Sequence, residues 1–113
     1  MIALRGDRTG WLRIRALVDT GATFMVLPET TARRLGQPTR HRVRVRLADG
    51  TYRNVPMMSV FVKLDGHEAP ATALVVPGGQ VLLGAETLEG LGVTLDMRRR
   101  RLKVMREPAI TLA

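Results

Sequence analysis

The stretch Ala16-Leu17-Val18-Asp19-Thr20-Gly21-Ala22-Thr23 brings a single carboxylate to the end of a short apolar run. The run has the length of a buried strand, and the Thr-Gly pair directly after it indicates a turn. A carboxylate at the end of a buried strand has to be hydrogen-bonded, paired or used, because burying a lone ionised carboxylate is very costly. Gly21 allows a tight reversal and the close approach of a ligand, and the small Ala22 suits a crowded site. Asp19 is therefore the first candidate functional residue, and the alternative is an aspartate that only caps a turn.

Short runs with turn signals at close intervals recur along the chain, which is typical of an all-β, barrel-like domain. The expected strands are 1–5, 11–18, 24–27, 40–47, 60–64, 71–76, 81–83, 93–96 and 102–105. Two short helices are also expected, because proline in the first turn and glycine just past the last turn mark helix ends. They run from Pro28 through Leu35 to Gly36, and from Ala85 through Leu91 to Gly92. We expect a single domain over residues 1–113, with 107–113 as a loose tail.

The segment 40–47 alternates without a break, so its arginines share one face and its uncharged side chains share the other. The two sets are Arg40, Arg42, Arg44 and Arg46, and His41, Val43, Val45 and Leu47. Ala48-Asp49-Gly50-Thr51 follows, and Asp-Gly is the strongest short signal for a hairpin. The return arm begins at Tyr52, and Pro56 within it requires a sheet edge or a bulge.

Asp19-Thr20-Gly21-Ala22 after an apolar strand resembles the active-site loop of the aspartic proteases, in the form found in the single-domain retropepsins. Val81-Leu82-Leu83-Gly84, followed by Ala85-Glu86-Thr87-Leu88, is similar to the second motif of that family, an apolar-apolar-Gly strand before a short helix. These motifs and the hairpin between them follow the family's order from about Trp11 to about Val104. The chain looks most like the small stand-alone members of bacteria and archaea. The resemblance implies the closed, barrel-like acid-protease fold with a flap hairpin.

The resemblance also implies an aspartic endopeptidase whose catalytic residue is Asp19. Thr20, Gly21 and Ala22 would form the active-site loop, Ala48, Asp49 and Gly50 the tip of the flap over the substrate, and Leu83 and Gly84 the packing of the second motif. The chemistry of this family uses two neighbouring carboxylates that share a proton and activate a water molecule against the peptide bond. It requires no metal and no other cofactor.

A single chain supplies only one Asp-Thr-Gly, because the other aspartates lack its sequence context. The second carboxylate is therefore expected from Asp19 of another copy in a two-fold homodimer. One departure concerns that dimer: Ala85, followed by Glu86, stands where retroviral enzymes have an arginine that helps to tie the two chains. The contacts that hold this dimer are then expected to differ. The rival from another class is a catalytically silent module that binds peptides with the same dimer.

The composition of the chain argues against metal-binding and membrane-spanning functions. The chain has no cysteine, and His41 and His67 share no ligand spacing with a carboxylate, so no metal site is expected. No stretch is long and apolar enough to span a bilayer, and the N-terminal residues turn polar too early for a signal peptide. The expected location is cytoplasmic, without a membrane partner.

The net charge of +8 rests almost wholly on arginine, which suits a nucleic-acid partner, an acidic substrate or an arginine-rich host proteome. The arginines of 40–46 would stand about 7 Å apart on one strand face, a spacing that could follow phosphates. Stacking aromatic residues are nearly absent, at 4% of the chain. A solvated strand face is therefore favoured over an arginine-rich nucleic-acid binder. Trp11 is expected to serve packing, and Arg98–Arg101 to form a solvated hairpin end.

Overall fold

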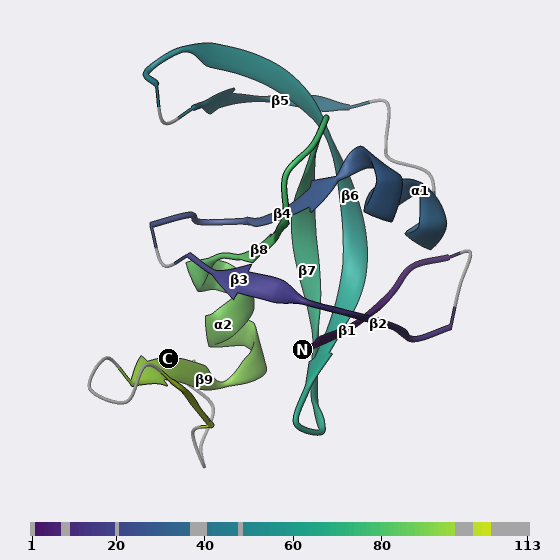
Figure 1. Cartoon of the computed structure of the whole chain (residues 1–113), viewed down its shortest axis with the longest axis vertical. Coiled ribbons are helices and arrows are strands. Elements are labelled where there is room, and N and C mark those ends of the chain that lie inside the picture. Colours follow the sequence, from purple (N-terminus) through teal and green to yellow (C-terminus); the bar gives the residue numbers. More distant parts are fainter. Residues whose placement is uncertain are drawn as a thin grey trace, which may run out of the picture.

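The computed structural model describes residues 2–7, 10–19, 21–36, 41–47, 49–96 and 101–104. Ten strands and two helices lie within these ranges (Figure 1). They are β1 (Ile2–Arg5), β2 (Leu12–Ile14), β3 (Ala16–Val18), β4 (Met25–Pro28), α1 (Glu29–Leu35), β5 (Arg42–Arg46), β6 (Tyr52–Leu64), β7 (His67–Val76), β8 (Val81–Leu83), α2 (Ala85–Leu91), β9 (Val93–Asp96) and β10 (Arg101–Val104). The tail expected over 107–113, and residues 98–100 of the expected hairpin end, lie outside the described ranges.

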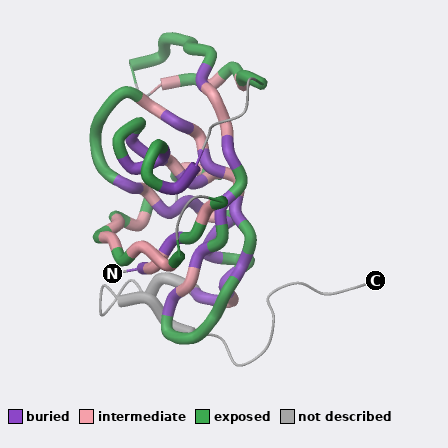
Figure 2. The backbone as a smooth tube through the Cα atoms, turned by 90° about the vertical axis from the view of Figure 1, so that its right-hand side faces the viewer, coloured by how far each residue is buried: buried purple, intermediate pink, exposed green. Residues whose placement is uncertain are grey.

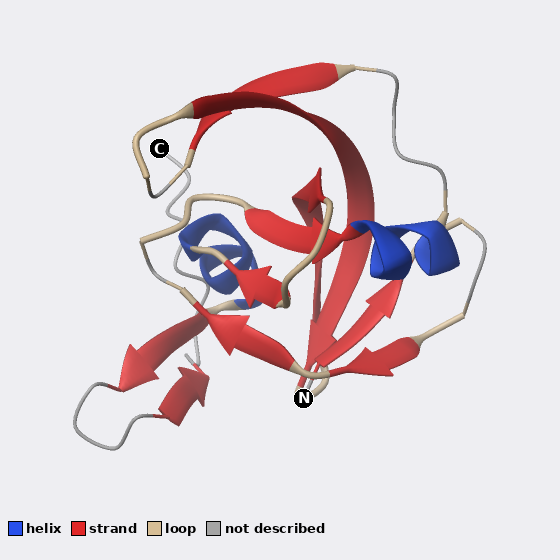
Figure 3. Cartoon of the chain, turned by 45° about the horizontal axis from the view of Figure 1, so that its top comes forward, coloured by secondary structure: helices blue, strands red, loops and turns tan. Residues whose placement is uncertain are grey.

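The main sheet has the strand order β2-β1-β6-β7-β4-β8-β3, and β5 adds to β6 beside this path. Most neighbours are antiparallel, but β3 pairs with β8 and β4 pairs with β7 in parallel. The sheet curls into a nearly closed barrel with the two helices packed against it, and β9 and β10 form a separate pair (Figure 3). The predicted all-β, barrel-like fold with two short helices is confirmed.

The core lies inside the curled sheet and under α2. Alternate residues of the long strands are buried while their neighbours are exposed or half-buried, as the colours along the tube in Figure 2 show. On β6 the buried set includes Val60 and Val62, and on α2 it includes Leu88 and Leu91. Each such aliphatic side chain contributes roughly 1.5–3 kcal/mol by leaving water. This period-two burial is the physical reason for strands at these positions.

β6 is longer than the sequence indicates, since the return arm of the hairpin and the expected strand 60–64 form one continuous strand. Pro56 lies within it and pairs with Arg42 of β5, whereas pairing with β7 begins only at Met57. Proline lacks an N–H group, so it is tolerated where the strand has a neighbour on one side only. The requirement for an edge at this position is thus confirmed.

The expected strand 11–18 is divided into β2 and β3, with Arg15 between them. The single-strand prediction is wrong here because the two halves have different neighbours. β2 pairs antiparallel with β1, whereas β3 crosses over to pair in parallel with β8. The helix after Pro28 begins one residue late, because Pro28 is itself the extended last residue of β4, with a ψ of 148°.

Candidate functional site

The loop after β3 holds the carboxylate of Asp19 in a tight turn. The N–H of Gly21 donates to Oδ1 of Asp19 at 3.0 Å, and the N–H of Ala22 donates to the backbone oxygen of Asp19 at 3.1 Å. A side-chain bond to the backbone two residues ahead is the geometry by which aspartate stabilises turns. The orientation of the carboxylate is thereby fixed by its own loop. Thr20 lies outside the described residues.

The second motif is joined to this loop by backbone hydrogen bonds. The N–H of Asp19 donates to the oxygen of Leu83 at 2.9 Å, which extends the β3–β8 pairing by one residue. At the start of α2, the N–H of Ala85 donates to the oxygen of Ala22 at 2.8 Å, and the N–H of Glu86 to that of Thr23 at 3.0 Å. The first N–H groups of a helix need acceptors outside the helix, and here the loop carbonyls provide them. The two motifs therefore form one hydrogen-bonded unit.

Gly84 is required where the two motifs meet. A Cβ atom at this position would lie 2.5 Å from the backbone oxygen of Phe24 and 2.7 Å from those of Ala22 and Thr23. The oxygens of Ala22 and Thr23 already accept hydrogen bonds from the start of α2 and cannot move away cheaply, so any larger residue would displace the loop that carries Asp19. The expected packing role of Leu83 and Gly84 has this geometric basis.

An apolar surface extends from Asp19 across the sheet. Register places Leu17 opposite Leu82, Leu82 opposite Val26, and Val26 opposite Leu74, so these four side chains share one face. On β4, β7 and β8 the neighbours of these residues along the strand are buried in the core, and on β3 they are half-buried. Of the four residues themselves, Leu17 is exposed and the other three are half-buried. These four side chains therefore form an apolar surface on the sheet, and one end of this surface lies at the loop of Asp19.

The β5–β6 hairpin lies over this face, and between them is a cleft of about 510 Å³. Figure 1 shows the hairpin arching above β4 and β8. The residues that line the cleft are Asp19, Gly21, Ala22, Thr23, Phe24, Val26, Val45, Arg46, Leu47, Leu74, Val76 and Leu82. Among these described residues Asp19 is the only acid. The cleft therefore presents one carboxylate at the end of an aliphatic floor.

From residue 42 to 47 the hairpin keeps the two faces that the sequence predicts, whereas His41, expected on the uncharged face, is exposed. Val43, Val45 and Leu47 are half-buried, while the arginines between them are exposed. At its tip, the N–H of Leu47 donates to the oxygen of Thr51 at 2.8 Å, and Gly50 has a φ of 88°, a value that favours glycine. Ala48 lies outside the described residues.

The carboxylate of Asp49 organises this tip. Its Oδ1 accepts a bond of 2.6 Å from the hydroxyl of Thr51 and one of 2.9 Å from the N–H of the same residue. These bonds, that of the hydroxyl first, hold the pKa of Asp49 below its ordinary value of 3.8. Because both donors already serve the turn, Asp49 fits a structural role in the hairpin.

Asp19 itself is exposed in the single chain, whereas the sequence indicates a buried strand before it. Leu17, two residues earlier, has 50% of its surface exposed. The cause is the position of β3, which is the last strand of the sheet order and has a neighbour on one side only. The expected burial is therefore not provided by this chain, and the open side of β3 is where a further surface would have to supply it.

The floor of the cleft is not predictable from the sequence alone. Val26, Leu74 and Leu82 come from three strands far apart in the chain, and only the register brings them together. Alternation indicates which residues of each strand share a face, but it does not identify the neighbouring strand. The half-buried positions were therefore recognisable one strand at a time, and their joint surface was not.

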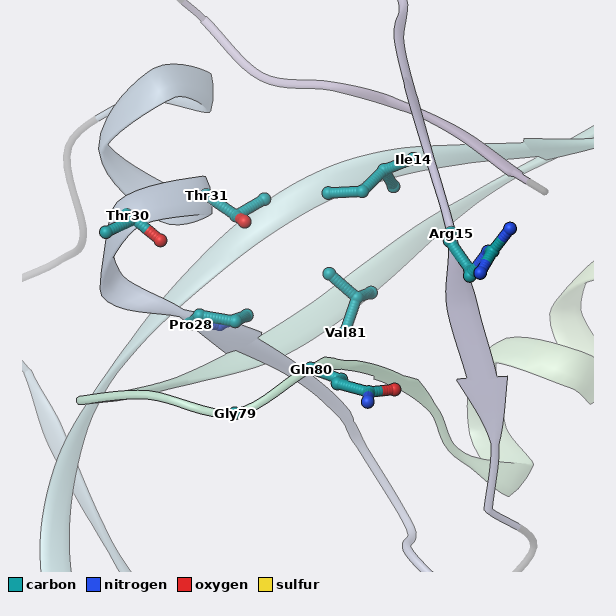
Figure 4. A pocket seen from close by; sticks show the side chains of 8 residues that line it. All are labelled: Ile14, Arg15, Pro28, Thr30, Thr31, Gly79, Gln80 and Val81. Atoms are coloured by element: carbon teal, nitrogen blue, oxygen red, sulfur yellow. The ribbon is translucent and has the colours of Figure 1, made fainter.

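A smaller depression of about 270 Å³ lies between α1 and the start of β8. Figure 4 shows that Thr30 and Thr31 come from the helix, Arg15 from the β2–β3 link and Gln80 from the segment before β8. None of the predicted site residues lines it. It holds no acid among its described lining residues and is not part of the arrangement around Asp19.

The described residues hold neither a metal-binding cluster nor a membrane-spanning helix. No group of three or more histidine, cysteine, aspartate or glutamate side chains is placed to hold a metal ion. No helix in the described ranges is long and apolar enough to cross a membrane.

Comparison with protein families gives one match. The model of a family described as aspartyl protease matches residues 5–87, which include the loop of Asp19, the hairpin and the strand of the second motif. Comparison with curated proteins finds no match.

Proposed function

Since the chain belongs to the aspartyl protease family, we propose that it is an aspartic endopeptidase whose catalytic pair is Asp19 of two copies. One observation carries this proposal. A carboxylate, fixed by the N–H of its own loop glycine, stands exposed at the end of an apolar cleft that a hairpin covers. The retropepsin-like fold and the two interlocked motifs agree with the same activity.

The chemistry follows from bringing two such carboxylates together. Two like charges a few ångström apart do not both ionise easily, so the pair shares one proton and titrates as a unit. The ionised member takes a proton from a water molecule, which attacks the peptide carbonyl. The protonated member gives its proton to the carbonyl oxygen, and a proton then passes to the leaving nitrogen. Each step uses only the two carboxyl groups and water.

The exposed edge of β3 supports the dimer. In one chain Asp19 has no acidic neighbour among the described residues of the cleft, and Leu17 beside it is half in solvent. A two-fold axis at this edge would place the two Asp19 side chains opposite each other and would cover the exposed leucine. The resemblance to the family also assigns Thr20 to this contact, as a residue that reaches across to the partner's loop.

The cleft suits an extended peptide with apolar side chains. Its floor of leucine and valine would take such side chains, and the backbone oxygen of Gly21, next to Asp19 in the loop, would accept a hydrogen bond from the peptide main chain. The inward side chains of the hairpin, Val45 and Leu47, form the opposite wall. Closure of the hairpin over the peptide would exclude water other than the attacking molecule.

Cleavage of an unfolded protein tests the proposal. Casein is incubated with the wild type, with Asp19→Asn and with Asp65→Asn, from acid to neutral pH, with and without a statine inhibitor. Asp65 lies in the exposed turn between β6 and β7, so its variant is a matched control for loss of one carboxylate. We expect cleavage by the wild type and by Asp65→Asn, loss with Asp19→Asn, and inhibition by the statine. A wild type that binds peptide but cuts none over this range would instead identify a silent peptide-binding module.

A further inference from the structure

A second surface, which shares no residue with the cleft, combines aromatic rings with cations. Register places Ala3 of β1 between Arg13 of β2 and Lys63 of β6, and Arg5 of β1 opposite Phe61 of β6. The intervening residues of β1 and β6 are buried in the core. The side chains of Arg5, Arg13, Phe61 and Lys63 therefore lie together on the outer face of the barrel.

Trp11 completes a stack on this face. The guanidinium carbon of Arg5 lies 5.1 Å from the centroid of Trp11 and 5.0 Å from that of Phe61. The Nζ atom of Lys63 lies 5.4 Å from the centroid of Trp11. Rings and cations thus alternate in the order Phe61, Arg5, Trp11, Lys63. We call these four residues, together with Arg13, the aromatic–cationic face.

Core packing does not account for this arrangement. Phe61 has 45% of its surface exposed, on a strand whose inward residues are fully buried. The chain has only four aromatic residues, and three of them, Trp11, Tyr52 and Phe61, contact a cation in the described ranges. Significant cation–π pairs occur about once per 70–80 residues, and here three of the four such contacts involve one small face. Two of the four aromatic side chains of the chain, Trp11 and Phe61, therefore lie together on this face, and Phe61 is exposed to solvent.

We infer that the aromatic–cationic face binds single-stranded nucleic acid. Unpaired bases stack on aromatic rings, and Phe61, an exposed ring at the end of the stack, offers such a surface. Arg13 and Lys63 would meet phosphates. A net charge of +8 favours a polyanion of this kind. The scarcity of aromatic residues in the sequence argues against nucleic acid, but two of the four lie together on one basic face, which weakens that objection.

The surroundings of the face fit such a ligand. A depression of about 330 Å³ lies beside Trp11, Arg13 and Lys63, with room for a sugar or a base. An ion pair joins Lys63 to Glu68 at 3.9 Å, and both side chains are about half exposed. Exposed pairs of this kind contribute little, so Lys63 can exchange Glu68 for a phosphate. Asp65, in the turn beyond Leu64, also lines the depression.

The only tryptophan of the chain reports on this face directly. Twenty-residue oligo(dT) and oligo(U) are titrated while Trp11 emission and the anisotropy of a labelled strand are recorded at several salt concentrations. We expect the strands to quench Trp11, to bind more weakly as salt rises, and to bind better than a duplex of the same length. Phe61→Leu keeps the apolar bulk and removes the ring, so affinity should fall about tenfold or more.

A pair of double variants separates this face from net charge alone. Arg5→Gln with Arg13→Gln removes two charges from the aromatic–cationic face, and Arg42→Gln with Arg44→Gln removes two from the outer face of β5. We expect a loss of about tenfold or more in the first and less than about threefold in the second. Circular dichroism confirms that each variant is folded.

Equal losses in the two doubles, or binding without quenching of Trp11, would overturn the inference. So would absence of binding to either strand, or a response of Trp11 only to anionic phosphatidylglycerol vesicles. Asp19→Asn should bind the strands as the wild type does, so this result does not depend on the proposed proteolysis.

Discussion

At the scale of single residues, the two motifs can pack together because Gly84 has no Cβ atom. Asp19, Gly21 and Gly84 are recognisable in the sequence as motif positions. The sequence does not explain why residue 84 has to be glycine. The three oxygens that exclude a Cβ atom there belong to residues 22–24, some sixty positions earlier in the chain. Likewise, the apolar character of Leu17 predicts burial, and only the place of β3 in the sheet order explains its exposure.

Gly84→Ala is therefore expected to destabilise the protein by about 1–3 kcal/mol, the usual cost of overpacking. The Cβ atom would force the oxygens of Ala22, Thr23 and Phe24 apart and would shift the loop that carries Asp19. Urea denaturation gives the free energy of unfolding. Gly78→Ala is the matched control, because nothing lies within 4 Å of a Cβ atom there and its stability should change by less than about 0.5 kcal/mol. Equal stability of the two variants would contradict the close approach at Gly84.

At the scale of elements, alternation predicts the two faces of β5 correctly, and the Asp-Gly signal places the hairpin tip. The predicted strand boundaries are wrong where a strand changes its neighbour in the sheet. β6 runs through Pro56 because its partner changes there from β5 to β7, and the segment 11–18 breaks at Arg15 for the same kind of reason. A periodic pattern shows which side chains share a face, but the partner strand is set by the rest of the fold.

The hairpin tip should show a measurable dependence on pH. The pKa of Asp49 is lowered by its bonds from Thr51, so those bonds stabilise the turn fully above the ordinary value of 3.8 and are lost as pH falls through the lowered pKa. Thr51→Val removes the hydroxyl bond and keeps that of the N–H. We expect the pKa of Asp49 to rise toward 3.8, as measured by an NMR titration of its carboxyl carbon. Thr51→Ser keeps the hydroxyl and should leave the pKa low; a rise of the same size in both variants would show that the hydroxyl is not the cause.

At the scale of the whole molecule, the spacing of turns and the two motifs were enough to predict a barrel-like β fold, but not its connections. The parallel pairs β3–β8 and β4–β7 join segments that no local pattern relates. They matter for function, because β3 and β8 carry the two motifs and their pairing brings the loop of Asp19 onto α2. The same order leaves β3 at the edge of the sheet, where the proposed dimer would bring in the second carboxylate.

An active site shared between two subunits should lose activity when the wild type is mixed with an inactive variant, whereas an enzyme that works as a single chain should not. If Asp19 of both copies is needed, a folded Asp19→Asn subunit should disable each wild-type subunit with which it pairs. Wild type is mixed with a ninefold excess of Asp19→Asn and allowed to exchange before cleavage of a fluorogenic peptide is measured. Random pairing leaves about a tenth of the wild-type subunits with a wild-type partner, so activity should fall to about a tenth of that of the wild type alone.

The same excess of Asp65→Asn is the control for this mixture. That variant keeps Asp19, so its mixed dimers are competent and the activity should rise in proportion to total protein. Sedimentation of each mixture confirms that subunits associate at the concentration used. Activity that stays at the wild-type level in the Asp19→Asn mixture, with dimers present and exchange complete, would mean that each chain cuts alone. The exposed edge of β3 would then need an explanation other than catalysis.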